Sequence, residues 1–136
     1  MNDHYPLEDV DLIKIDVQGY EVKAFKGMTD IIEKNKDHLV ILAEYSPTLL
    51  LNFEAEENGV EAFHGFLETK CTHIYLVHKQ VDDQKNAIIS PINSRQLKEQ
   101  VALLKQATND QGLDACLDLI LLFSDAGHSS FLNKLS

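Results

Sequence analysis

Short hydrophobic runs alternate along this chain with segments whose apolar residues recur at helical spacing. Residues 10–17 (VDLIKIDV) and 38–45 (HLVILAEY) are rich in β-branched side chains, which favours strands. Between them, residues 21–34 carry apolar side chains at helical spacing, and Gly27 is placed to interrupt or bend that helix. Strand, helix and strand with short joints predict a βαβ unit with parallel strands and a right-handed crossover.

The second half of the chain continues the pattern. In chain order we expect a helix at residues 60–68, a strand at 72–78, a short extended piece at 88–91, an amphipathic helix capped by Asn93 and Ser94, a strand at 117–123 and a polar tail. The strand at residues 10–17 has apolar positions on both faces, which is typical of a parallel sheet covered on both sides. The pattern therefore predicts an α/β fold.

Composition and charge narrow the classes of function. Apolar residues make up 44% of the chain and charged residues 25%, the profile of a soluble globular protein. The net charge is −10, and the 12 Lys and Arg residues form no cluster that would bind a nucleic-acid backbone. The apolar stretches are too short to span a membrane, and no signal peptide is visible. We expect a cytoplasmic protein that binds neither nucleic acid nor membrane.

Cysteine and histidine spacing gives no metal signature. Cys71 and Cys116 lie far apart and match no CxxC pattern, so we expect two buried free thiols. The six histidines show neither HxH nor HExxH spacing, which argues against a metal site made of histidine.

Two carboxylates end the first two predicted strands. Asp16 ends the strand at residues 10–17, and Glu44 ends the strand at residues 38–45. Open α/β sheets bind ligands outside the carboxyl ends of their strands, so neighbouring strands would place both carboxylates at that rim. Such a pair could orient a substrate hydroxyl, accept its proton or hold a divalent metal. The structural alternatives are that Asp16 caps the following helix and that Glu44 pairs with Lys14.

Lys14 is unusual because it interrupts an otherwise apolar strand. By the two-residue period of a strand, it shares a face with Asp16. A lysine buried on both sides is costly unless its charge is paired, so we expect an ion pair with Asp16 or another acid. A catalytic lysine is the alternative.

The segment around Asp16 carries a family resemblance. Residues 14–21 (KIDVQGYE), followed by Phe25, Lys26 and Gly27, resemble the KIDV(E/Q)G-x-E…LKG signature of FkbM-type methyltransferases. The later predicted elements recur in that family in the same order, so the resemblance covers nearly the whole chain. Family members are S-adenosylmethionine-dependent enzymes of the class I, Rossmann-like fold, and many of them methylate hydroxyls of sugars or other secondary metabolites.

The resemblance implies a function and a set of site residues. It implies O-methylation of a small-molecule acceptor hydroxyl, with S-adenosylmethionine as the cofactor. It places Asp16, Glu44 and Lys14 on the catalytic side and Asp16, Gln18 and Gly19 on the cofactor side. A divalent metal between the carboxylates is an added hypothesis.

The sequence departs from the family pattern in the cofactor-binding half. In this fold the cofactor lies mainly on the first three strands, with a Gly-rich loop after the first, and no GxG loop precedes Asp11. The resemblance maps this chain onto strands four to seven, in the order 4-5-7-6, with the last two strands antiparallel. We therefore expect residues 1–136 to form a single partial methyltransferase domain, a fragment inactive on its own. The alternative is a non-catalytic α/β module that associates, for example as a homodimer, through the open edge of its first strand.

Overall fold

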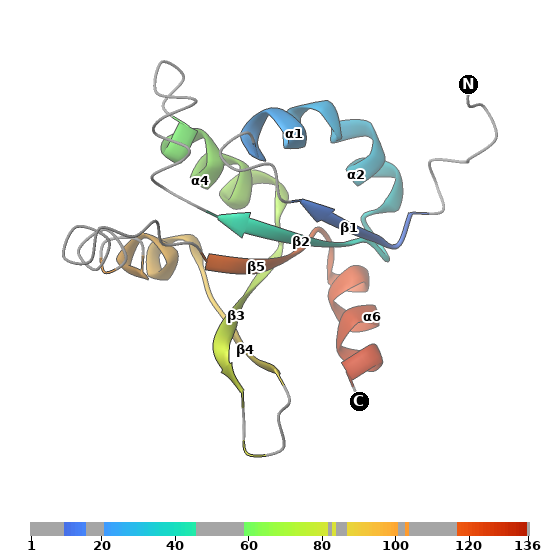
Figure 1. Cartoon of the computed structure of the whole chain (residues 1–136). Coiled ribbons are helices and arrows are strands. Elements are labelled where there is room, and N and C mark those ends of the chain that lie inside the picture. Colours follow the sequence, from blue (N-terminus) through green and yellow to red (C-terminus); the bar gives the residue numbers. More distant parts are fainter. Residues whose placement is uncertain are drawn as a thin grey trace.

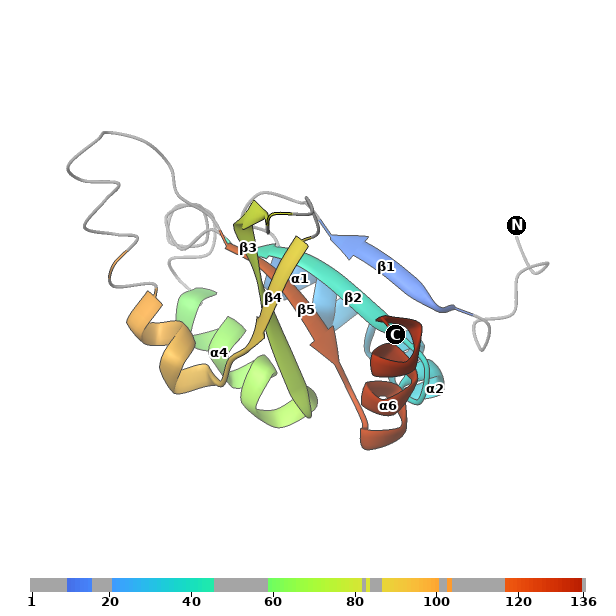
Figure 2. The same cartoon turned by 90° about the horizontal axis from the view of Figure 1, so that it is seen from below.

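The computed structural model describes residues 10–15, 21–45, 59–81, 83, 87–100, 103 and 117–135. These residues form a five-stranded mixed sheet with helices on both faces (Figures 1 and 2). The elements in chain order are β1 (Leu12–Ile15), α1 (Glu21–Gly27), α2 (Thr29–Asn35), β2 (Val40–Tyr45), α4 (Gly59–Lys70), β3 (His73–Val81), β4 (Ala87–Pro91), β5 (Leu117–Leu122) and α6 (Asp125–Leu135). Residues 94–100 are also helical.

The strands stand in the order β1-β2-β5-β3-β4. β1 and β2 are parallel, with Leu12 paired to Val40 and Ile15 to Ala43. β5 runs antiparallel to both β2 and β3, and β4 runs antiparallel to β3. The predicted order of four strands and the predicted antiparallel pair are therefore confirmed. β4, which the sequence indicated only as an extended piece, adds a fifth strand at one edge.

The crossover between β1 and β2 consists of two short helices. α1 ends at Gly27 and α2 begins at Thr29, so the predicted interruption is confirmed. The Thr29 hydroxyl donates to the Lys26 carbonyl across the break, at 3.0 Å. Asn35 then closes α2: its amide nitrogen donates to the Ile31 carbonyl, and its oxygen accepts from the Val10 amide just before β1. This buried asparagine ties the start of β1 to the end of the crossover.

One face of the sheet, which we call the α4 face, is covered by α1, α2 and α4 (Figure 1). It holds the main core, in which alternate residues of β2, such as Ile41, Ala43 and Tyr45, pack with Phe25 and Phe63. The aromatic rings are in close contact, with centroids 4.6 Å apart for Tyr45–Phe63 and 5.8 Å for Phe25–Phe63. Large rings packed in this way dominate core energetics.

The opposite face, which we call the α6 face, is covered by α6 (Figure 2). Phe131 of α6 packs on Ile120 and Leu122 in a second, smaller core cluster, while Val40 and Leu42 are only partly buried there. The expectation of a polar tail after residue 123 was therefore wrong. The helix begins because the Ser124 hydroxyl accepts from the Gly127 amide, as an N-cap residue does.

The prediction that β1 is buried on both faces was also wrong. Leu12 is 60% exposed and Lys14 is exposed, whereas Ile15 is buried. Among the described residues β1 is an edge strand, and its side chains on the α6 face lack a covering element over them. The Lys14 ammonium group is therefore hydrated. This removes the desolvation cost that led us to expect a buried ion pair.

Helix 94–100 starts as predicted at a polar cap. The Gln96 amide donates to the Asn93 side-chain oxygen at 2.8 Å, and the Asn93 amide donates to the Gln96 side-chain oxygen at 2.9 Å. These reciprocal bonds form a capping box. Leu97 of this helix is fully buried in the main core, which fixes the helix beside α4. Within the described part of the chain, no helix has the length and apolar character needed to cross a membrane.

Candidate functional site

The carboxyl ends of the parallel strands β1 and β2 form the rim that the sequence indicated. The two strands are neighbours, which was the premise for bringing Asp16 and Glu44 together. Ile15 pairs with Ala43, so Glu44 follows directly after the last described pair. Asp16, Gln18 and Gly19 lie outside the described residues, and their predicted roles stay predictions.

Glu44 lies on the α6 face and is half-buried. In the antiparallel pairing of β2 with β5, it stands directly opposite Asp118. Directly opposed residues of antiparallel strands have Cβ atoms about 5 Å apart, so this pair places two carboxylates side by side. The rim therefore concentrates negative charge on the α6 face.

Lys14 lies on the same face of the sheet as Glu44, but further from the carboxyl ends of the strands. It pairs with Leu42, one step below Glu44 on the same face of β2. No ion pair among the described residues joins Lys14 to Glu44, so the proposed structural pairing of these two side chains is wrong. Lys14 is an exposed cation near the acidic rim.

Tyr45, the residue after Glu44, points into the α4 face and is 0% exposed. Its hydroxyl lies 3.2 Å from Nε2 of His64, and Nδ1 of His64 lies 3.1 Å from the Ser94 hydroxyl. The Ser94 hydroxyl in turn donates to Oε1 of Glu68 at 2.9 Å. Ser94 has a single proton, so it accepts from Nδ1–H of His64, and Nε2 accepts from Tyr45. This chain of bonds, which we call the Tyr45–Glu68 chain, joins β2, α4 and helix 94–100.

Burial determines the protonation states of Tyr45 and His64 in the Tyr45–Glu68 chain. Desolvation raises the pKa of the Tyr45 hydroxyl above its ordinary range, with a smaller contribution from the nearby Glu61 carboxylate. Desolvation also lowers the pKa of His64, and the Lys98 cation adds to that effect, against the opposing influence of Glu68 and Glu61. Both groups are therefore neutral near pH 7, and sequence reasoning had not singled out His64 at all. Its partners lie 19 and 30 residues away in the chain, so local pattern gave no signal for it.

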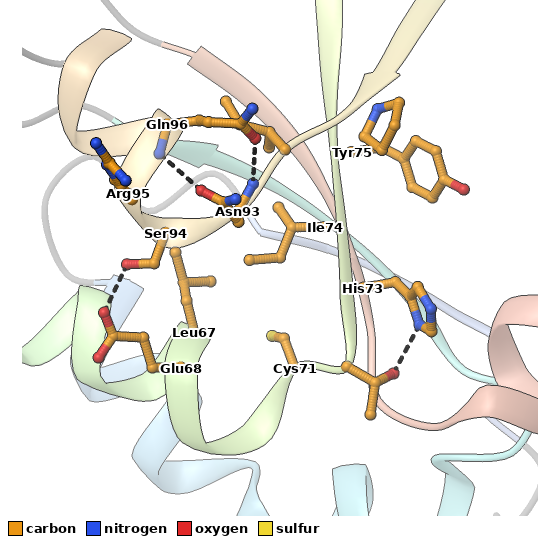
Figure 3. Close-up of a pocket in the computed structure, with 13 residues that line it drawn as sticks. Leu67, Glu68, Cys71, His73, Ile74, Tyr75, Asn93, Ser94, Arg95 and Gln96 are labelled. Atoms are coloured by element: carbon orange, nitrogen blue, oxygen red, sulfur yellow. Dashed lines mark hydrogen bonds between the residues drawn. The ribbon is translucent and has the colours of Figure 1, made fainter.

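One cavity lies away from the rim. It has a volume of about 710 Å³ and lies beside the amino end of β3, where Leu67 and Cys71 of the α4 segment face Ile74 and Ser94 (Figure 3). Burial raises the pKa of the Cys71 thiol, which is free as predicted, so this thiol is a poor nucleophile. Cys116 lies outside the described residues.

A second cavity, of about 200 Å³, lies between the crossover helices and α4. Neither cavity is lined by Glu44 or Tyr45. These two cavities therefore do not reach the rim, where Glu44 is the described carboxylate. Those residues also include no group of three or more His, Cys, Asp or Glu side chains able to hold a metal ion, so the divalent-metal hypothesis gains no support.

Comparison with known proteins gives one result. The family model for the methyltransferase FkbM domain matches residues 1–68, a segment that includes β1, the crossover, β2 and most of α4. No curated protein and no solved structure matches the chain. The matched half is the half that carries the rim.

Proposed function

Because this chain belongs to the FkbM methyltransferase domain family, we propose that its β1–β2 rim is the acceptor side of an O-methyltransferase. The family uses S-adenosylmethionine in general, which supplies the methyl group. The observation that carries the proposal is the parallel pairing of β1 with β2, which brings the two strand ends to one edge. The last described pair, Ile15 with Ala43, comes one residue before Asp16 and Glu44 in the sequence.

The proposed chemistry needs only positioning and a proton acceptor. A carboxylate at the rim would accept a hydrogen bond from the acceptor hydroxyl and take its proton as the oxygen becomes a nucleophile. Glu44 has the required exposure, since it is half-buried yet faces the less covered side of the sheet. Asp16 is the second carboxylate of this proposal, and the exposed Lys14 nearby would donate a hydrogen bond to an oxygen of the acceptor. A small hydroxyl-bearing sugar or secondary metabolite fits this arrangement.

The strongest test removes the carboxylates one at a time. Asp16→Asn and Glu44→Gln are introduced at the matching positions of a family member that also carries the Gly-rich cofactor strands, and transfer of a labelled methyl group is measured. Loss of a general base lowers the rate by about 10²–10⁴-fold. The matched control is the substitution matching Glu33→Gln, an exposed acid on α2 that pairs with Lys36. An undiminished rate in both rim variants would remove the assigned role.

The cofactor side is tested on this chain directly. Since neither of the two cavities described above lies at the rim, we expect calorimetric titration with S-adenosylmethionine to give no binding, or binding weaker than about 1 mM, equivalent to roughly −4 kcal/mol. Micromolar affinity would show that residues of this chain hold the methyl donor. The expectation that the chain lacks a cofactor site would then be wrong.

A second candidate function is a non-catalytic module that pairs through β1. Two observations favour it: among the described residues β1 has a neighbour on one side only, and Leu12 is 60% exposed on it. Sedimentation velocity would then show a dimer that Leu12→Lys disrupts, because a charge on an edge strand blocks edge-to-edge pairing. Leu103→Lys, at an equally exposed helical position, is the matched control and should leave the dimer intact. A monomeric wild-type protein would contradict this candidate.

A further inference from the structure

The C-terminal helix α6 is attached to the sheet by few side chains. Of its residues, only Gly127 and Phe131 are buried. Phe131 fills the second core cluster with Ile120 and Leu122, and its ring lies 5.5 Å from that of Tyr75. Leu132 and Leu135 are 41% and 57% exposed. Polar contacts join its other end to the sheet.

Those polar contacts centre on two stacked imidazoles. The rings of His73 on β3 and His128 on α6 lie face to face, with centroids 3.6 Å apart and planes inclined by 16°. The Tyr75 hydroxyl lies 2.7 Å from Nε2 of His128, and Nδ1 of His73 lies 3.1 Å from the Thr72 hydroxyl. In the neutral state, the Tyr75 hydroxyl and Nε2 of His128 share one hydrogen bond, and the two rings attract by stacking.

Protonation acts on the stacking contact. A protonated His128 carries hydrogen on both ring nitrogens, so Nε2 donates to the Tyr75 oxygen and that bond is kept. If both rings are charged, two cations stand in stacking contact at a partly solvated site, where like charges repel. The lowered pKa of His128, due first to desolvation and then to His73, agrees with this repulsion.

The other charged groups near His73 and His128 do not cancel the repulsion between the two charged rings. Asp125 on α6 favours the charged form of His128, but less strongly than desolvation and His73 disfavour it. The turn before β2 contributes Lys36 and Asp37, of opposite charge, below Gly127. At that point the Ser124 hydroxyl bonds the Lys36 carbonyl at 2.9 Å, and a Cβ on residue 127 would lie 2.6 Å from the same oxygen. This end of the helix is a tight, pH-independent pivot.

We propose that α6 is an acid-released cover of the sheet: protonation of the His73–His128 stack detaches the helix beyond its Ser124 pivot and exposes the apolar strip of Ile120 and Leu122. The proposal is independent of the methyltransferase assignment, because it involves neither the rim carboxylates nor an acceptor.

Hydrogen exchange followed by mass spectrometry tests this on the full chain. Rates are corrected for the intrinsic effect of pH and compared for peptides spanning α6 and β2 at about pH 5 and pH 7.5, on either side of the ordinary histidine pKa. The wild-type α6 peptide should exchange about tenfold faster at the lower pH, because repulsion between the two charged rings favours the detached helix. The β2 peptide should remain slower than α6 at both values, because the opening is local.

Three variants make the result decisive. His73→Gln removes one charge without touching the Tyr75 bond and should cut the pH effect to under about threefold. His78→Gln, at an exposed histidine of the same strand that bonds Ser90, is the matched control and should retain the full effect. Phe131→Ala should release α6 at both pH values and gives the exchange rate of a detached helix.

Three outcomes would overturn the proposal. The first is an α6 exchange rate that does not change between the two pH values. The second is a full pH effect in His73→Gln, which would show that the stack is not the sensor. The third is a single common rate for α6 and β2, because the opening would then be global unfolding.

Discussion

The two faces of this sheet are built from alternate residues of the same strands, yet they differ in kind. The α4 face is covered by α1, α2, α4 and helix 94–100 and carries a core of tilted aromatic rings, Phe25, Tyr45 and Phe63. The α6 face is covered by a single helix, and Glu44 and Asp118 remain on it beside half-buried aliphatic side chains. The comparison shows that the two faces of one sheet can differ in cover: one face holds most of the packed core, and the other leaves ionisable groups within reach of solvent.

The largest expected effect comes from truncating one buried ring on the α4 face. Phe63→Ala removes a side chain that is 0% exposed and should lower the free energy of unfolding by about 3–5 kcal/mol. Leu42→Ala, at a half-buried position on the α6 face, should cost about 1 kcal/mol, since less apolar area is removed from the interior. Urea denaturation measures both. Equal losses would show that the two faces do not differ in stability.

The second prediction compares the two tyrosines that bond histidine, one on each face. Tyr45→Phe leaves Nε2 of the buried His64 without a donor and should cost about 1–3 kcal/mol. Tyr75→Phe removes the hydrogen-bond partner of His128 on the α6 face, where the partly exposed ring can bond water instead, so it should cost under about 1 kcal/mol. Urea denaturation measures both losses in the free energy of unfolding. A larger loss for Tyr75→Phe than for Tyr45→Phe would contradict the difference between the two faces.

The third prediction is a dependence of stability on pH from His64. Its pKa is lowered in the folded chain, so the unfolded chain binds more protons as the pH falls below the ordinary histidine value. Stability is therefore fully present above about pH 6.5 and decreases below it, by at most about 1.4 kcal/mol per pH unit. His64→Gln should flatten that slope, while His38→Gln, at a surface histidine paired with Asp11, should leave it in place. An unchanged slope in His64→Gln would assign it to other groups.

The smallest effect concerns the opposed carboxylates on the α6 face. Asp118→Asn removes one of two like charges that face each other across β2 and β5, and it should raise the free energy of unfolding by about 0.2–1 kcal/mol. The gain should shrink at high salt, because exposed charges are screened. A destabilised variant would indicate that Asp118 has a favourable partner at the rim.

The strand order and the rim were predictable because they depend on local patterns and on one family motif. β2 was expected at residues 38–45 and is found at Val40–Tyr45, and the break after Gly27 lies where glycine and helical spacing placed it. The neighbouring position of β1 and β2 followed from the βαβ pattern. Glu44 therefore lies at the carboxyl end of β2, as the sequence predicted.

The failures share one physical cause, which is that burial depends on what covers a face. Lys14 looked buried because its strand is apolar, but a strand at the edge of the described sheet loses one neighbour and most of its cover. α6 was missed because it buries one large side chain, Phe131, which is too little to give a helical periodicity. The Ser124 cap was the available signal, three residues before Gly127.

The position of β5 has a consequence for how the chain folds during synthesis. β5 is inserted between β2 and β3, which precede it in the chain and do not pair with each other. Until Leu117–Leu122 has left the ribosome, both of those strands keep an unpaired inner edge, and closing so long a loop is slow. The centre of the sheet thus forms last. During that interval, the β5 strand of a neighbouring copy would fit the same gap, so strand exchange between copies is the misfolding route that this topology favours.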